Sequence, residues 1–391
     1  MILILLALLV VLGAGFPFVM IEARRRGLGF WVFAELTRAA VEPKGDVHLL
    51  LCIADHYEPY WNDVGPEVAD GRVDRWVRDY PSYFADFQDS DGRPPRHTFF
   101  YPIDQYDAKH VDALASLCRA GFGEIEVHLH HHDDTSENLR ATLLAHKELM
   151  ALKHGIGARD SSTGELTYAF IHGDWALDNS RPDGRCCGVD DELNVLRETG
   201  CYADLTMPSY PSTTQTRKIN SLYHAVDDPT RPKSHDWGFD VGSTPAPMDS
   251  LLMIQGPLTV DWTRRVKGFL PRVENSCIQG NQAASIERLD AWLKARVQVP
   301  SRPDWYFVKL HTHGAPEANQ KVLLEGPMVE FHKALARKAA ADPSFHYHYV
   351  TARELANLVK AAEAGWRGSV DKVRDYQFVW DSANAVLSQP S

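Results

Sequence analysis

The sequence has few cysteines, and none of them is spaced as a disulfide framework or a zinc ribbon. Six occur in 391 residues, with Cys186 and Cys187 adjacent and no CxxC pair. A secreted domain built on disulfides needs a dense, paired cysteine pattern, which this chain does not provide. We therefore expect unpaired, buried thiols.

The chain also lacks an excess of basic residues. Its formal net charge is −11 at pH 7, which disfavours a polyanion such as nucleic acid as the main partner. Hydrophobic residues make up 44% and charged residues 24% of the sequence, which are ordinary values for a folded globular protein. A chain of this length can hold one large catalytic domain and a short appendage.

The first part of the chain lacks charge altogether. Met1–Ile21 has no charged side chain, and a helix of about 20 apolar residues spans a bilayer. No basic residue precedes this stretch and no clear small-x-small cleavage site follows it, so we expect an uncleaved membrane anchor rather than a signal peptide. Arg24, Arg25 and Arg26 follow directly, and the positive-inside rule then places the globular domain in the cytoplasm.

From Val47 onward, hydrophobic β-rich runs alternate with helical patterns. This alternation predicts an α/β fold, and we expect an irregular (β/α) barrel of about seven parallel strands behind an N-terminal transmembrane helix. The predicted divisions are a transmembrane anchor at 1–23, a juxtamembrane connector at 24–45 with a helix at 30–36, the barrel at 46–362 and a polar C-terminal tail at 363–391. Residues 58–95 are expected to form a long insertion, and residues 208–247 an extended loop region with a hairpin at 221–226.

Metal- and proton-binding side chains stand where four of the predicted strands end. The clusters are Asp55-His56, His128 to Asp133, His172-Gly173-Asp174 and His311-Thr312-His313. The C-terminal ends of parallel barrel strands share one face, and the active sites of such barrels lie there. The sequence therefore predicts one site assembled from these clusters.

His128 and His132 are predicted metal ligands. At a strand end that turns into a loop, a spacing of four residues can bring two imidazoles onto one ion. Asp55 or His56 would complete a three-ligand zinc site with an open position for water, which is the hydrolytic arrangement. The residues leave open which of these two is the ligand and which takes a proton from water. The alternative is a solvent-exposed run of histidines.

His311 and His313 lie at the end of the strand predicted at 305–311. We expect them to point in different directions, so that one reaches the site as general acid while the other packs against its wall. The residues of a predicted substrate-side loop are His172, Asp174, Trp175 and Asn179. A structural turn with Trp175 in the core is the alternative for this loop.

The motifs together resemble those of the NodB-homology polysaccharide deacetylases, the fourth carbohydrate esterase family. Ala54-Asp55-His56 stands where that family has an Asp-Asp pair, and His128 to His132 matches its His-x-x-x-His metal motif. The segments His97–Phe100, Val308–His311 and Tyr349–Leu355 resemble its second strand, its closing Leu-His motif and its last strand and helix. The resemblance covers residues 47–360. Residues 170–175 stand in place of the family's Arg-Pro-Pro-Gly signature.

The resemblance implies a metal-dependent hydrolase that removes acetyl or similar acyl groups from a sugar. A divalent ion, with zinc expected first, would be held by His56, His128 and His132, with Asp55 as base and His311 as acid. The implied substrate is a surface polysaccharide or its lipid-linked precursor, with other glycan-biosynthesis proteins as partners. The residues expected to bind that substrate are His172, Asp174, Trp175, Asn179 and His313.

Two other functions fit the same fold. A barrel glycosidase needs two carboxylates that flank the scissile bond, and Asp55 and Asp174 are the candidates. A non-catalytic glycan-binding or assembly subunit would keep the fold without the catalytic activity. This alternative is allowed by the departures from the family at Asp55-His56 and at residues 170–175.

Overall fold

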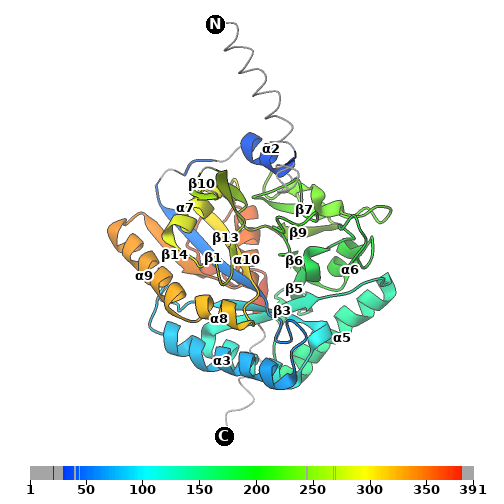
Figure 1. Ribbon diagram of the computed structural model, residues 1–391. Helices are drawn as coiled ribbons and strands as arrows, with labels where there is room; N and C mark the ends of the chain where they lie inside the picture. The colour runs from blue at the N-terminus through cyan, green and yellow to red at the C-terminus, as the bar shows by residue number, and fades with distance from the viewer. Residues whose placement is uncertain are drawn as a thin grey trace, which may run out of the picture.

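The computed structural model describes residues 21, 30–38, 41–43, 45–243, 245–266, 268 and 270–380. These residues form a mixed α/β fold around a largely parallel sheet (Figure 1). The thirteen strands of this sheet are β1 (Val47–His56), β2 (His97–Pro102), β3 (Gly123–Leu129), β4 (Ala158–Asp160), β5 (Leu166–His172), β6 (Cys201–Asp204), β7 (Leu222–Val226), β8 (Phe239–Asp240), β9 (Ser250–Ile254), β12 (Cys277–Ile278), β13 (Trp305–Thr312), β14 (Phe345–Tyr349) and β15 (Phe378–Trp380). The expected α/β class is confirmed.

Across the sheet, hydrogen-bonded neighbours lie in the order β12-β13-β1-β2-β3-β5-β6-β9-β7-β8. All pairs from β12 to β9 are parallel, whereas β7 pairs antiparallel with β9 and β8. β14 pairs with residues 47–51 of β1, and β2 pairs with residues 54–56. The C-terminal ends of β1, β3, β5 and β13 therefore meet at one edge, where the four sequence clusters lie.

Helices follow most of the strands. They are α2 (Phe30–Thr37), α3 (Pro66–Phe84), α4 (Ala108–Leu117), α5 (Ser136–His154), α6 (Glu192–Glu198), α7 (Ile286–Ala295), α8 (Glu317–Leu323), α9 (Gly326–Ala341) and α10 (Ala352–Glu363). Asp107, Thr135 and Thr351 cap the first turns of α4, α5 and α10, because their side chains accept hydrogen bonds from backbone amides there.

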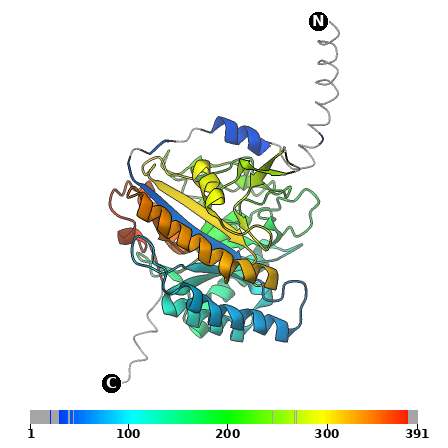
Figure 2. The ribbon, with the colours of Figure 1, turned by 60° about the vertical axis from the view of Figure 1, so that its left-hand side comes forward.

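Both faces of the sheet are covered by apolar side chains. On one face, Leu51 and Ile53 of β1 join a core with Trp76 of α3 and Phe331 of α9. Figure 2 shows α9 running alongside β13 and β1. On the other face, Leu50, Cys52 and Ala54 pack in a second core that includes residues of α10. A strand covered on both sides reads as a continuous hydrophobic run, which explains the sequence of β1.

The sheet is strongly curved. Lys309 of β13 donates hydrogen bonds to the carbonyl oxygens of Leu205 and Met207, at 2.7 and 2.6 Å, just beyond the end of β6. Four strands separate β13 from β6 in the sheet order, so this contact requires the sheet to bend round on itself. Lys309 is fully buried, and its burial lowers the pKa of the ammonium group to about 8.

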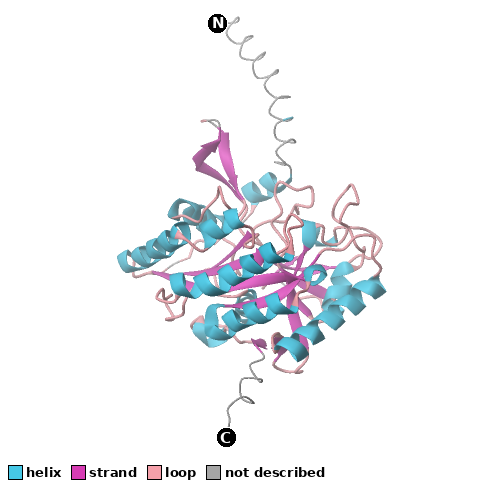
Figure 3. Cartoon of the chain, turned by 60° about the horizontal axis from the view of Figure 1, so that its bottom comes forward, coloured by secondary structure: helices cyan, strands magenta, loops and turns pink. Residues whose placement is uncertain are grey.

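The segment predicted as an insertion, 58–95, contains the long helix α3. Its buried residues Val73, Trp76, Tyr80 and Phe84 recur every three or four positions, which is a helical period that the acidic and aromatic composition concealed. Residues 259–274 also differ from expectation, because they form the antiparallel ribbon β10 (Thr259–Val266) and β11 (Leu270–Glu274). Figure 3 shows this ribbon projecting from the body of the molecule.

The two ends of the chain give mixed outcomes. The expected helix at 30–36 is present as α2, and Trp31 packs in a small core with Ile219 and Leu258. Within the tail predicted at 363–391, β15 pairs antiparallel with β4. The anchor predicted at 1–23 lies outside the described residues except for Ile21. Of the helices that are described, none is both long and apolar enough to cross a membrane.

The cysteine prediction is confirmed for pairing and nearly so for burial. All six thiols are free, and five of them are buried. Cys186 is only partly covered.

Candidate metal centre

Glu58 lies at the centre of a group of imidazoles at the C-terminal edge of the sheet. Its Oε1 is 3.0 Å from Nε2 of His128 and 2.9 Å from Nε2 of His130. Its Oε2 is 3.4 Å from Nδ1 of His313. We call Glu58, His128 and His130 the Glu58 centre, because their three ligand atoms lie close enough together to hold one metal ion.

Outer contacts fix the two imidazoles of this centre. Nδ1 of His128 is 2.8 Å from the carbonyl oxygen of Ile171 and donates to it, so that Nε2 faces Glu58. Nδ1 of His130 is 3.2 Å from both carboxylate oxygens of Asp104. Gly173 packs against the His130 ring so closely that a Cβ there would overlap it. The ring therefore occupies a space that only glycine leaves open.

His56 and His313 complete the group. The His56 ring centroid is 4.9 Å from that of His128 and 4.8 Å from that of His313. Among the described residues, Nε2 of His56 is buried without a hydrogen-bond partner, whereas Nδ1 of His313 and Oε2 of Glu58 are buried and have only each other, at 3.4 Å. Buried polar atoms are normally paired, so the unpaired nitrogen of His56 beside the long Glu58–His313 contact marks a site that can take a ligand from outside the chain.

The charges at this centre suit a cation. Burial alone would raise the pKa of Glu58, but the hydrogen bonds to His128, His130 and His313 outweigh it and hold that pKa well below its usual range. Burial, followed by the nearby His313 and His128, holds the pKa of His56 well below its usual range. Burial would also lower the pKa of His130, yet Asp104 and Glu58 raise it to about 10. The carboxylate is thus ionised and His56 is neutral, while the excess negative charge attracts a proton or a metal ion.

Two tryptophans border the imidazoles. The Trp61 ring lies 4.7 Å from that of His313, and Trp61 is 37% exposed. The Trp175 ring lies 6.0 Å from that of His56 and 5.9 Å from that of His313. Trp175 has a φ of 55° and follows Asp174 with a φ of 51°. Such backbone is costly for a bulky residue and is typical of functional loops.

The structure brings together four of the sequence-predicted site residues and leaves His132 out. His56, His128, His313 and Trp175 meet at the Glu58 centre. The side chain of His132 is 54% exposed, and its Nδ1 is 3.3 Å from the carbonyl oxygen of Cys187. The structure therefore does not bring the two histidines of the His-x-x-x-His motif together at this centre.

Glu58 and His130 belong to the candidate metal centre, although the sequence analysis did not name either of them as a ligand. Side chains two residues apart share one face of an extended chain. Glu58 stands two residues after His56, and His130 two residues after His128. That period of two was the signal that could have found both residues, and it fits the extended ends of β1 and β3.

Asp55 does not reach the imidazoles. It is fully buried, with Oδ2 2.8 Å from Nε2 of His97 and Oδ1 accepting a hydrogen bond of 2.6 Å from the amide of Gly314. Trp76 of α3 donates to the carbonyl oxygen of the same Gly314. Neighbouring strand residues point to opposite faces, so Asp55 lies on the α3 side of β1 and His56 on the other.

Replacing Asp55 by alanine is expected to lower the free energy of unfolding by about 2–4 kcal/mol, because two buried donors lose their acceptor. Asp55→Asn keeps an oxygen for the Gly314 amide and is expected to cost less. Urea unfolding of both variants measures the difference. If Asp55→Asn kept full stability and metal content but lost all turnover, the role of base would return to Asp55.

His311 and His313 lie on the same side of the chain, contrary to the expectation that they point in different directions. Both are close enough to His56 to lower its pKa. They are two residues apart, which is the spacing that places side chains on one face of a strand. His311 is buried near Lys309, and burial followed by that charge holds the pKa of His311 well below its usual range.

The other predicted substrate-loop residues have different surroundings. His172 faces His131 and Glu192. Asp174 is exposed, and Nδ2 of Asn179 donates to Asp190 at 2.7 Å. Asp55 and Asp174 therefore do not form the carboxylate pair that a glycosidase requires.

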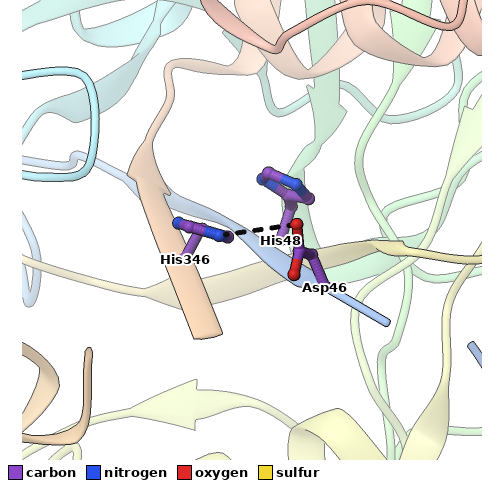
Figure 4. Close-up of side chains that lie close together, drawn as sticks. All are labelled: Asp46, His48 and His346. Carbon is purple, nitrogen blue, oxygen red and sulfur yellow. Dashed lines mark ion pairs between the residues drawn. The ribbon is translucent and has the colours of Figure 1, made fainter. Parts of the chain in front are cut away.

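Another histidine group lies at the opposite edge of the sheet. Asp46, His48 and His346 stand at the N-terminal ends of β1 and β14 (Figure 4). The rings of His48 and His346 are stacked, with centroids 4.8 Å apart and an angle of 20°. Oδ2 of Asp46, which is 65% exposed, is 3.9 Å from Nε2 of His346. Stacked imidazoles direct their in-plane lone pairs side by side, so this group is a poorer ligand set than the Glu58 centre.

No protein-family model matches the chain, and no curated protein matches its sequence.

Proposed function

We propose that this chain is a metal-dependent hydrolase that removes acetyl or similar acyl groups from a sugar, on an irregular (β/α) barrel. The observation that carries the proposal is the convergence of Glu58, His128 and His130, with His56 and His313 beside them. The curvature of the sheet and the resemblance of the strand-end motifs to NodB-type deacetylases support the same proposal. The proposal also includes a membrane anchor at 1–23 and a cytoplasmic domain, and both rest on the sequence alone.

The Glu58 centre fits zinc. Two imidazole nitrogens and one carboxylate oxygen are a common catalytic zinc set, which leaves a fourth position open. Ligand atoms bound at about 2.0–2.1 Å around a tetrahedral ion lie about 3.3 Å apart, close to the 2.9 and 3.0 Å between Glu58 and the two imidazoles. A divalent ion held by these residues would supply Lewis-acid polarisation of an acyl carbonyl group.

His56 and His313 are proposed to move the protons of the reaction. His56 has a buried ring nitrogen without a partner among the described residues and lies next to His128, and Nδ1 of His313 has only a contact of 3.4 Å with Glu58. One would accept a proton from water and the other would donate one to the leaving amine or hydroxyl. Asp55 is proposed as a positioning residue, because it holds the amide of Gly314, which directly follows His313.

Trp61 and Trp175 are proposed to bind the sugar ring. Their indoles approach the imidazoles from different elements, and aromatic faces pack well against the apolar face of a pyranose. The exposed edge of Trp61 leaves the site open toward solvent. A surface glycan or its lipid-linked precursor could then enter from this side.

The proposal is tested by acetate release from N- and O-acetylated sugars by the purified full chain. We expect activity that a chelator removes and zinc restores. Activity indifferent to chelation would contradict a metal-dependent hydrolase, and release of sugar instead of acetate would show a glycosidase. A chain that binds metal but releases no acyl group from a broad panel would be a glycan-binding subunit.

A further inference from the structure

A second group of ligand atoms converges beside the Glu58 centre. Nε2 of His131 is 3.0 Å from Nε2 of His172 and 3.2 Å from Oε1 of Glu192. Nε2 of His172 is 3.6 Å from the same oxygen. The side chains of His172 and Glu192 are fully buried and that of His131 is 7% exposed. We call these three residues the Glu192 centre.

Every outward-facing atom of the Glu192 centre has a partner. Nδ1 of His131 is 2.9 Å from Oδ2 of Asp134, and Nδ1 of His172 is 2.5 Å from the carbonyl oxygen of Gly173. Both partners can only accept, so each Nδ1 carries the hydrogen and each neutral ring has a lone pair on Nε2. Oε2 of Glu192 accepts a hydrogen bond of 2.6 Å from the amide of Asp178. With both rings neutral, three lone pairs would face one another, which is unfavourable unless a metal ion or a proton on His131 lies between them.

We propose that the Glu192 centre binds a second divalent metal ion, of the zinc type. The three separations of 3.0, 3.2 and 3.6 Å bracket the distance of about 3.3 Å between ligands of a tetrahedral zinc ion. Two imidazoles select zinc or a similar transition metal over calcium and magnesium, which prefer oxygen ligands. Carboxylate and carbonyl groups behind the histidines are the usual outer partners of such ligands. Gly188 packs so closely against the His131 ring that no side chain could replace it.

This ion would fasten the loop that carries Trp175. His172 is the last residue of β5 and Glu192 the first of α6, so the ion joins the two ends of the loop between them. His131 adds the end of β3, next to His130 of the Glu58 centre. Trp175 and Asn179 within the loop have positive φ values of 55° and 50°. A fixed cross-link at its base would hold this strained loop against the catalytic imidazoles.

The inference does not rest on the proposed hydrolase activity, and its test reads metal binding alone. The full chain carrying His130→Ala loses the Glu58 centre and isolates the other one. After removal of metal with a chelator and reloading with zinc, we expect about one ion per chain in this variant and about two in the wild type. Zinc is also expected to raise the Tm of the variant, because it binds the folded chain only.

Adding Glu192→Gln to His130→Ala is expected to abolish both the remaining ion and the rise in Tm. Glu198→Gln, on the exposed end of the same helix, is the matched control and should change neither. Cobalt loading of His130→Ala gives a second readout that needs no further substitution, since tetrahedral cobalt absorbs visible light. If His130→Ala retained no zinc, showed no Tm shift and gave no cobalt band, the inference would be overturned, and a protonated His131 would occupy the place of the ion.

Discussion

Replacing His130 by alanine is expected to lower the zinc affinity of the Glu58 centre by more than about 100-fold, because loss of an outer partner alone costs 10- to 100-fold. Nε2 of His130 is 2.9 Å from Glu58, and its ring is held by Asp104. Acyl release should fall to background, since the polarising ion would be absent. Metal analysis by mass spectrometry, together with acetate release, measures both effects.

His132→Ala is the matched control for this prediction. It removes an imidazole two residues away that is 54% exposed and lies outside the Glu58 centre. We expect unchanged metal content and turnover. Glu58→Gln, which keeps the shape and removes the charge, should behave like His130→Ala. If His132→Ala lost the ion while His130→Ala kept it, the ligand pair would be the His-x-x-x-His pair read from the sequence.

Replacing Arg374 by methionine is expected to lower the free energy of unfolding by about 3–5 kcal/mol, because the change leaves buried carboxylates without their counter-charge. Arg374 is 3.2 Å from Glu354, 3.3 Å from Asp89 and 2.7 Å from Asp91. Its guanidinium also donates to the carbonyl oxygen of Tyr349 at 2.7 Å. Arg367→Met, at an exposed position seven residues earlier, is the control and should change stability little. Urea denaturation curves give both values.

The ion pairs of Arg374 with Glu354, Asp89 and Asp91 also predict that the folded chain loses stability in acid. Burial would raise the pKa of Glu354, but Arg96, Arg374 and Arg353 outweigh it and lower that pKa to about 2 from an ordinary value of 4.5. A depressed folded-state pKa contributes stability that is present above about pH 4.5 and is lost as the pH falls toward about 2. Arg374→Met should weaken this dependence. An Arg374→Met chain as stable as the wild type at every pH would show that the network does not hold the C-terminal segment.

Much of the fold could be predicted from the sequence. The alternation of hydrophobic runs and helical patterns predicted the α/β class, and residues of the type that caps helices, Asp107 and Thr351, stand where α4 and α10 begin. These signals are local, because a period of two or of 3.6 residues and a cap are set within one element. The ends of β1, β3, β5 and β13, which carry the histidine and carboxylate clusters, share one edge of the sheet. They do so because parallel strands align their C-terminal ends.

Only the tertiary structure decided which side chains at that edge meet. Four histidines stand in the stretch 128–132, and the structure directs His128 and His130 to Glu58, His131 to Glu192, and His132 to solvent. The sequence determined that metal-binding groups gather at the ends of the strands. Their partners come from β1 and α6, far along the chain, and depend on strand register, sheet curvature and loop backbone, which no local pattern encodes.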